Sequence, residues 1–568
     1  MRGFVMISKT LRELITIIFV ACLIGAAMSL VTNMFVSGVE AVSELRAKDT
    51  FFNLELNGQL FSFGSVIFLW ITALAVYFVK TSLDLKAWAG PADSIYAAHQ
   101  SREPLDLKRG FGSTFAAFLS ASGGAAVGQY GPLVHFGATM GVWVKRFLSP
   151  SLSNEVYLGC GVAAAISAGF NAPIAGIIFA HEAILRLFSI RAVAPISIAA
   201  ITASAVDRFL FPSDATFAVD AVLPPLIEIL PALIAITPIL SLVALAFMLS
   251  LRTAQRYAAS FTGPPFLLTF LAATCCGLLG VWLPDVLGLG MGQMNQMLAG
   301  EFALGMLVLL FLGKLLATTL CIGFGLFGGV FGPAIFIGIA AGGVLGGIAE
   351  MLGLSNFVLI ASVASMAAVS ASVIGAPITA TIIILELTQS YEFAVAAMVT
   401  VMLCNLITQR VFALSFFDRQ LLDRGVDLRG GREAIHLKQI QSAELATNEG
   451  IILDDTVDGN QARAILEEKS LTEAYICGEN GVLMGKVSLF HTLKAGSGPL
   501  KDYMDPEPFS LAGTDSLSDA MSKVANFVGE SIPIVEMETG VLLGTVTEGD
   551  LFNAVIEVQG EIVKQERG

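Results

Sequence analysis

Long apolar segments recur along this chain and restrict its fold more than any other feature. Residues 14–30, 60–79, 230–251, 266–283 and 306–322 are long enough to cross the hydrocarbon core of a bilayer. Inside a bilayer every backbone polar group needs a partner within the protein, so segments of this length predict membrane-spanning helices. The composition agrees, because 55% of the 568 residues are hydrophobic and only 14% are charged, against about 25% in soluble domains. The sequence therefore predicts a multi-pass helical membrane protein.

The N-terminal segment predicts an orientation for the first helix. Arg2, Lys9 and Arg12 precede the first apolar stretch, and no small-residue cleavage site follows it. This pattern indicates a retained helix rather than a signal peptide, and the basic residues favour a cytoplasmic N-terminus. Short loops between the apolar segments suggest a bacterial inner membrane. The net charge of −14 argues against nucleic acid as a partner.

The seven cysteines are scattered and form no Cys-x-x-Cys pair. We expect them to be small buried hydrophobic residues rather than metal ligands or a disulfide framework. No metal site is predicted. Four of them lie in apolar segments: Cys22, Cys275, Cys276 and Cys321.

Two glycine-rich breaks share one pattern in the two halves of the hydrophobic region. Residues 128–132 read Gly-Gln-Tyr-Gly-Pro and residues 329–333 read Gly-Val-Phe-Gly-Pro, and each precedes an apolar stretch. Proline is favourable at the first position of a helix, and a helix N-terminus presents unpaired N–H donors and the positive end of the helix dipole. Each break therefore predicts an anion site without a cationic side chain. Two such breaks are typical of a binding site in the middle of a membrane, built from broken helices.

These residues resemble the CLC family of chloride channels and anion/proton antiporters. Residues 329–333 match the family pattern Gly-x-Phe-x-Pro, and residues 170–176, Phe-Asn-Ala-Pro-Ile-Ala-Gly, resemble the next helix start of that family. Residues 128–132 match Gly-(Lys/Arg)-Glu-Gly-Pro, except that Tyr130 replaces the gating glutamate and Gln129 replaces the basic residue. The resemblance implies an all-α polytopic membrane domain of inverted helical repeats with broken helices. It also implies a homodimer in the lipid bilayer, in which each subunit conducts chloride and similar monovalent anions.

The resemblance also assigns an anion path. It implies an external site at the backbone amides of Gln129, Tyr130 and Gly131, and a central site at those of Val330 and Phe331. Two side-chain hydroxyls of the family are replaced, because Ala89 stands at the serine position and Phe417 at the tyrosine position. Tyr130 is the predicted gate, either as a hydrogen-bond donor to the anion or only as a bulky plug. The predicted path residues are Gly128, Gln129, Tyr130, Gly131, Pro132, Gly329, Val330, Phe331, Gly332, Pro333, Ala89 and Phe417.

Both carboxylates that handle protons in the antiporters of this family are replaced in the alignment. Tyr130 stands at the first position, where its hydroxyl stays neutral in the working pH range. Ala183 stands at the internal position, with Glu182 beside it. His135 and His181 lie at membrane depth, where they either relay protons or bond to neighbours. Two further charged residues in apolar segments are expected to make structural contacts: Glu386 and Lys314.

The chain changes character near Arg424, after which charged residues are frequent. We predict a membrane domain over 1–425, a linker over 426–442, and two related modules over 443–498 and 499–560. A repeat of helix and strand patterns across the two modules resembles a tandem pair of CBS modules, which implies an α/β cytoplasmic tail. Thr547 and Asp550 match the pattern that holds the phosphate and ribose of an adenine nucleotide (ATP, ADP or AMP). In the first module Ser488 is followed by His491 instead, and a purely structural, ligand-free pair remains the alternative.

The sequence therefore predicts a passive, proton-uncoupled chloride channel rather than an enzyme, with regulation through the tail if the tail binds adenine nucleotide. One alternative is a chloride/proton antiporter with an unusual proton route. A third reading is a transport-inactive membrane regulator that senses nucleotides.

Overall fold

The computed structural model divides the chain into two compact units, Met1–Val426 and Asp427–Gly568. It describes residues 2–47, 53–56, 59–100, 105–148, 153–188, 190–212, 225–412, 414–428 and 430–567.

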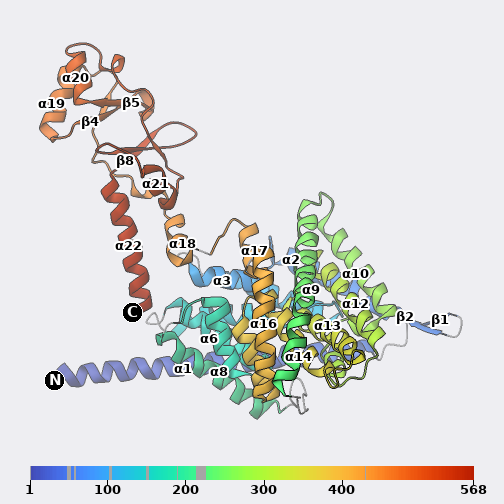
Figure 1. Ribbon diagram of the computed structural model, residues 1–568. Helices are drawn as coiled ribbons and strands as arrows, with labels where there is room; N and C mark the ends of the chain where they lie inside the picture. Colours follow the sequence, from blue (N-terminus) through green and yellow to red (C-terminus); the bar gives the residue numbers. More distant parts are fainter. Residues whose placement is uncertain are drawn as a thin grey trace. The chain divides into compact units, whose positions relative to one another are not determined.

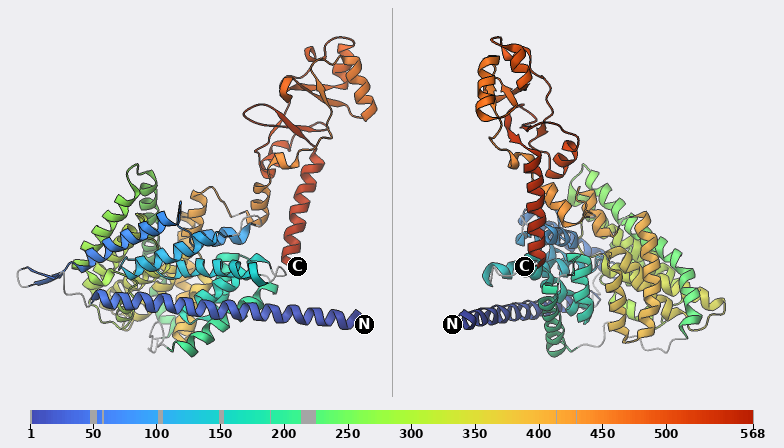
Figure 2. Two further views of the ribbon diagram at one scale, coloured as in Figure 1. Left: turned by 180° about the vertical axis from the view of Figure 1, so that it is seen from behind. Right: turned by 60° about the vertical axis from the view of Figure 1, so that its left-hand side comes forward.

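The first unit is helical, as the apolar segments predict. Among the described residues, eight helices are long and apolar enough to cross a membrane. The N-terminal end of α1 and the antiparallel hairpin β1–β2 project from this unit (Figures 1 and 2). The elements of the unit are α1 (Arg2–Ala47), β1 (Asn53–Leu56), β2 (Gln59–Ser62), α2 (Gly64–Ser82), α3 (Pro91–His99), α4 (Leu107–Ser122), α5 (Tyr130–Leu148), α6 (Asn154–Phe170), α7 (Pro173–Phe179), the π-helix η1 (Ala180–Leu185), α8 (Ile190–Leu210), α9 (Leu226–Ser260), α10 (Pro265–Trp282), the 3₁₀ turn η2 (Pro284–Val286), α11 (Met291–Leu298), α12 (Leu304–Gly323), α13 (Phe331–Met351), α14 (Val358–Ile374), α15 (Pro377–Thr388), α16 (Tyr391–Val411) and α17 (Phe416–Asp423).

The predicted membrane segments all fall in helices, with one local difference. The segment predicted over 60–79 starts with strand β2, and its helix, α2, begins only at Gly64. The first residues of that segment instead pair with β1.

Equivalent helices pack together in the two halves of this unit. The helix after the first break, α5, packs on α6, and the helix after the second, α13, packs on α14. Nearly every side chain of α6 and α14 is buried, as expected for helices that are apolar on all sides. A short helix beginning at an Ala-Pro-Ile sequence follows in each half, α7 and α15, and these two helices contact each other.

The second unit is an α/β structure built from two similar modules. The sheet orders are β3–β4–β5 and β6–β7–β8, and in each sheet the first pair is parallel and the second antiparallel. Each sheet packs against its own apolar core. The predicted repeat is therefore present. Its elements are α18 (Gly431–Gln439), η3 (Ser442–Leu445), β3 (Ile452–Asp454), α19 (Gly459–Lys469), β4 (Glu473–Cys477), η4 (Glu479–Gly481), β5 (Leu483–Ser488), α20 (Leu489–Ala495), η5 (Leu500–Asp502), β6 (Leu511–Ala512), α21 (Leu517–Val524), β7 (Ile532–Val535), β8 (Leu542–Val546) and α22 (Glu548–Arg567).

The segment predicted as a linker, 426–442, is in part a folded element of the second module. It contains α18, which packs against α21 and α22. Leu437 and Ile440 pack against the apolar core of that module, and the Ile440 carbonyl accepts a 2.8 Å hydrogen bond from the Leu517 N–H. These two apolar side chains explain why a mostly polar segment is held in place. The module boundaries at 443, 498 and 560 stay a prediction.

Candidate functional site

The two glycine-rich breaks meet in the structure. The Gly128 N–H donates to the Gly329 carbonyl over 2.7 Å, and the Gly329 N–H donates to the Gly128 carbonyl over 2.7 Å. A side chain does not fit at either position, because a Cβ on Gly128 would lie 2.9 Å from the Gly329 oxygen and one on Gly329 would lie 2.8 Å from the Gly131 nitrogen. The glycines therefore allow the backbones of two loops that are distant in the sequence to come into direct contact.

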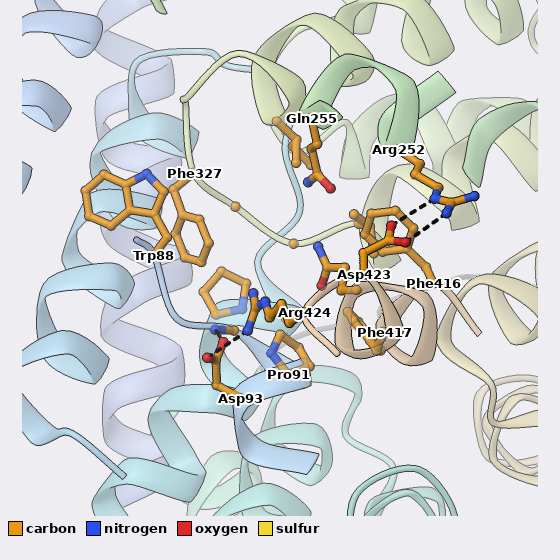
Figure 3. A pocket seen from close by; sticks show the side chains of 18 of the residues that line it. Trp88, Pro91, Asp93, Arg252, Gln255, Phe327, Phe416, Phe417, Asp423 and Arg424 are labelled. Carbon is orange, nitrogen blue, oxygen red and sulfur yellow. Dashed lines mark hydrogen bonds and ion pairs between the residues drawn. The ribbon is translucent and has the colours of Figure 1, made fainter. Parts of the chain in front are cut away.

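Four helices begin around one cavity of about 520 Å³ next to this pair of loops. The walls include the first residues of α3 and α17 and the residues at the starts of α5 and α13 (Figure 3). Helix N-termini carry partial positive charge and free N–H groups, so such an arrangement favours an anion. Of the predicted path residues, those that line the cavity are Gly131, Pro132, Gly329, Val330 and Phe417.

Phe417 lines this cavity, and Ala89 lies between two residues that line it; that they replace two hydroxyls of the family stays a prediction. Phe417 is buried in its wall and offers no hydrogen-bond donor. Ala89 is also buried, and its N–H donates to the Ser113 hydroxyl over 2.8 Å, while its neighbours Trp88 and Gly90 line the cavity. The sequence did not single out Ser113, which lies on another helix.

Tyr130 sits in a group of three aromatic rings beside the paired loops. Its ring stacks on Phe170 with centroids 3.9 Å apart and planes 14° apart, and Phe331 lies 5.6 Å away. Only 2% of the Tyr130 surface is exposed. Neither its hydroxyl nor the Gln129 side-chain oxygen has a hydrogen-bond partner. The Tyr130 hydroxyl and the Gln129 side chain lie close enough to interact with each other, but without a well-formed hydrogen bond both keep the capacity to bond a further polar group. Phe170 belongs to the motif at 170–176, and the sequence did not predict it as a site residue.

Arginines gather on two aspartates at the cavity. Asp423 pairs with Arg252, at 2.8 and 2.9 Å, and Asp93 pairs with Arg424 at 3.1 Å (Figure 3). Three other arginines join these pairs, so positive charges outnumber negative ones there. The sequence did not predict this group, because its members come from separate helices. The three are Arg256 and Arg419, at 3.3 and 3.5 Å from Asp423, and Arg109, at 3.3 Å from Asp93.

Glu182 and Glu386 cap each other's helices. The Glu182 carboxylate accepts hydrogen bonds from the N–H groups of Ile378 and Thr379, at 2.9 and 2.7 Å, at the start of α15. The Glu386 carboxylate accepts the equivalent bonds, at 3.0 and 2.7 Å, at the start of α7. Glu182, which stood beside the predicted internal proton position Ala183, is thus engaged in capping a helix. Glu386 makes the structural contact that was expected of it.

Each of the two histidines in the membrane unit makes one hydrogen-bond contact through Nδ1. His135 Nδ1 lies 2.8 Å from the Ser94 hydroxyl, and His181 Nδ1 lies 2.7 Å from the Leu187 carbonyl. The Nε2 atom of each ring is buried and unpartnered. His181 lies in the π-helix η1, a distortion that is frequent at functional sites.

In the tail, Thr547 and Asp550 bond to each other at the start of α22. The Asp550 carboxylate accepts from the Thr547 N–H at 2.9 Å and from its hydroxyl at 2.7 Å. The Asp550 N–H in turn donates to the Thr547 hydroxyl at 3.1 Å. This is the geometry of a helix cap, which accounts for both residues without a ligand. Ser488 and His491 form a similar contact, in which the Ser488 N–H donates to the imidazole Nδ1 at 3.3 Å.

Comparisons with known proteins identify the class. Residues 71–409 match the model of the voltage gated chloride channel family, and residues 500–557 match that of the CBS domain. The chain belongs to the voltage gated chloride channel, or CLC, family. It is therefore a multi-pass integral membrane protein of anion transport with a C-terminal CBS region, and not an enzyme. These findings confirm the predicted fold class.

The chain is also similar to individual relatives in sequence and to solved structures in fold. The chain is 27% identical over 409 residues to the H(+)/Cl(-) exchange transporter ClcA of Vibrio cholerae, an alignment that covers 68% of this chain and 84% of the relative. It is 27% identical over 422 residues to the protein of the same name from Yersinia pseudotuberculosis, covering 71% and 87%. Its fold is similar to that of a slow cyanobacterial Cl-/H+ antiporter, with a TM-score of 0.64, 18% identity and coverage of 72% and 98%. A eukaryotic CLC transporter gives a TM-score of 0.61 at 18% identity and covers 95% of this chain and 98% of its own.

Proposed function

We propose that this chain carries chloride and similar monovalent anions along a path through the cavity and past Tyr130. The observation that carries the proposal is the meeting of four helix starts around the paired loops at Gly128 and Gly329. Partial charges from several helix N-termini bind an anion favourably but weakly, as conduction requires. In this proposal the amides of residues 129–131 and 330–331 contact the ion, and Tyr130 takes the place of the gating glutamate.

Two modes of transport are candidates. Uncoupled flow is supported by Tyr130 and Ala183, which provide no carboxylate at the two positions that handle protons in the family. Exchange of anions for protons is supported by the relatives, which are named H(+)/Cl(-) exchange transporters. The comparisons favour exchange over the uncoupled channel predicted from the sequence. The buried, unpartnered Nε2 atoms of His135 and His181 are the groups that a different proton route would use.

Flux in proteoliposomes separates these modes. The purified full chain is reconstituted, a chloride gradient is imposed, and chloride and protons are followed together. In uncoupled transport, chloride flows until the membrane potential equals the chloride Nernst potential, and no protons move. Uphill proton movement at a fixed ratio to chloride would establish exchange, and its loss in His135→Gln or His181→Gln would identify the route. No flux of either ion would favour the transport-inactive regulator.

The proposed nucleotide site of the tail is tested on the full chain. If Thr547 and Asp550 bind the phosphate and ribose, a calorimetric titration should detect binding of AMP, ADP or ATP. Asp550→Ala should abolish that binding. Because Asp550 caps α22, the variant is also melted without nucleotide, and a cap loss of about 1 kcal/mol is expected there. If no nucleotide binds the unmodified chain, the two residues act only as a cap and the modules are a structural pair.

We also propose that a second copy covers the short helices α7 and α15, as the predicted homodimer requires. Both helices are too short to cross a bilayer. Ile174 and Ile378 at their starts are 53% and 46% exposed, next to the half-buried carboxylates of Glu386 and Glu182. Light scattering of the detergent-solubilised chain is expected to give twice the monomer mass, and Ile378→Trp is expected to give the monomer. A monomeric unmodified chain would contradict this proposal.

A further inference from the structure

Two cysteines contact each other beside Ala126, just before the first break. The Cys321 thiol on α12 donates to the Cys276 sulfur on α10, with the two sulfur atoms 3.4 Å apart. Both side chains have 0% exposure. The scattered cysteines were expected to be inert core residues, and nothing in the proposed anion path uses this pair.

Two buried basic side chains lie near this pair. Lys314 has 0% exposure, and its ammonium donates to the carbonyls of Val286 and Gly288 at 3.0 and 2.8 Å. Arg46, at the end of α1, packs so closely on Gly124 that a Cβ there would lie 1.7 Å from its Nη1 atom. That Nη1 atom is buried and has no hydrogen-bond partner.

Cys276 lies close to both of these basic side chains. Both Arg46 and Lys314 lie close enough to Cys276 to interact with it electrostatically. The hydrogen bond that the Cys276 sulfur accepts from Cys321 favours the thiolate of Cys276, and the nearby basic side chains add to this effect. The thiolate is the form that reacts with oxidants. The hydrogen bond from Cys321 places a second thiol ready to resolve the first product.

We propose that Cys276 and Cys321 form a redox-active dithiol, which a small peroxide converts into an intramolecular disulfide between α10 and α12. The Cys276 thiolate attacks one oxygen of hydrogen peroxide, the O–O bond breaks, and the departing hydroxide takes up a proton to leave as water. The product is a sulfenic acid at Cys276. The Cys321 sulfur then attacks the Cys276 sulfur, the S–S bond forms, and the S–O bond breaks. The leaving hydroxide takes the Cys321 proton as a second water. The two thiols lose two electrons, and the peroxide gains them.

The disulfide has a consequence for the anion path, which rests on the proposed function. The backbone of Ala126 lies beside both sulfur atoms, in the loop that leads directly to the Gly128–Gly329 pair. A disulfide bond requires the sulfur atoms to approach from 3.4 Å to about 2.0 Å. This approach draws α10 and α12 together beside the loop, and we expect anion flux to fall.

Intact-mass measurement tests the chemistry without any assumption about transport. The full chain, purified under reducing conditions, is treated with hydrogen peroxide and then with a thiol-blocking reagent. We expect the loss of two hydrogen masses, peptide mapping to a link between Cys276 and Cys321, and reversal by reductant. Cys276→Ser and Cys321→Ser abolish the link. Cys275→Ser, which changes the exposed neighbouring cysteine, is the matched control and keeps it.

Two results would overturn the proposal. One is that the folded chain forms no disulfide between Cys276 and Cys321, although the denatured chain forms it at the same peroxide concentration. The other is a link that joins different cysteines. Arg46→Gln is expected to slow oxidation several-fold, and an unchanged rate would contradict the activating role of Arg46. Flux before and after oxidation is measured in the same samples, so a chain that forms the disulfide but conducts no anion refutes only the proposed function.

Discussion

The loops at 128–132 and 329–333 have the same backbone construction and different side chains. Each reads Gly-x-aromatic-Gly-Pro, each starts a helix, and the two are hydrogen-bonded to each other. The first carries Gln129 and Tyr130, both with an unpartnered buried polar atom, whereas the second carries the apolar Val330 and Phe331. The comparison teaches that the backbone supplies the helix ends in both halves, while only the first of the two loops carries polar side chains.

Removing the Tyr130 side chain is expected to have the largest effect. Tyr130→Ala takes away the ring that stacks on Phe170, while the backbone amides remain, so anion flux in proteoliposomes should rise. Phe331→Ala is the matched change in the other loop, and we expect it to raise flux less. Equal effects of the two variants would mean that the loops are equivalent and that Tyr130 is not the gate.

A carboxylate at the same position should reverse that effect. Tyr130→Glu introduces a negative charge that competes with the anion, so flux should fall at neutral pH. Acidification protonates the carboxylate, removes the charge and should restore flux. Because Ala183 still supplies no internal carboxylate, full proton exchange is not expected in this variant. Flux that stays independent of pH would show that position 130 lies outside the path.

A smaller effect is expected when the first loop is given the side chains of the second. Gln129→Val with Tyr130→Phe keeps the ring and removes both polar groups. If the Tyr130 hydroxyl donates to the anion, anion affinity should weaken by about 0.5–1.5 kcal/mol, the usual net value of one hydrogen bond. Titration calorimetry with chloride measures this change, and Gln129→Val alone serves as the control. An unchanged affinity in the double variant would support the role of a plug without a donor.

Removing the charge of either helix-capping glutamate should give the smallest effect. It should lower stability and leave the coupling of proton to chloride movement unchanged. Glu182→Gln and Glu386→Gln each remove a negative charge from a helix N-terminus, which should lower stability by about 1 kcal/mol. Thermal melting of the two variants should therefore give similar losses. The ratio of protons to chloride should stay the same in both. A change of that ratio in Glu182→Gln alone would return Glu182 to the proton route.

The sequence predicted the parts of the fold that depend on local pattern. The Gly-x-aromatic-Gly-Pro spacing placed the starts of α5 and α13, and strand and helix patterns placed one helix and two strands in each tail module: α19, β4 and β5, and α21, β7 and β8. Apolar length predicted the membrane helices, and strand β2 is the exception, because the first residues of the segment predicted over 60–79 pair with β1 instead.

The contacts between distant segments were not predictable from such patterns. The caps that Glu182 and Glu386 give to α15 and α7 depend on how the two halves pack. The same is true of the stack of Tyr130 on Phe170 and of the arginines around Asp423. A single sequence shows where a polar side chain stands in a helix, but its partner is chosen by tertiary packing.

The two hydrogen bonds between Gly128 and Gly329 also limit how the path can open. Because each loop holds the other at 2.7 Å, the start of α5 cannot shift without carrying the start of α13 with it. A gate that worked by backbone motion would therefore have to displace both halves of the molecule together. Rotation of the Tyr130 ring away from Phe170 breaks none of these bonds. We therefore expect opening to be a local torsion of one side chain, whose rate is set by the packing of three aromatic rings.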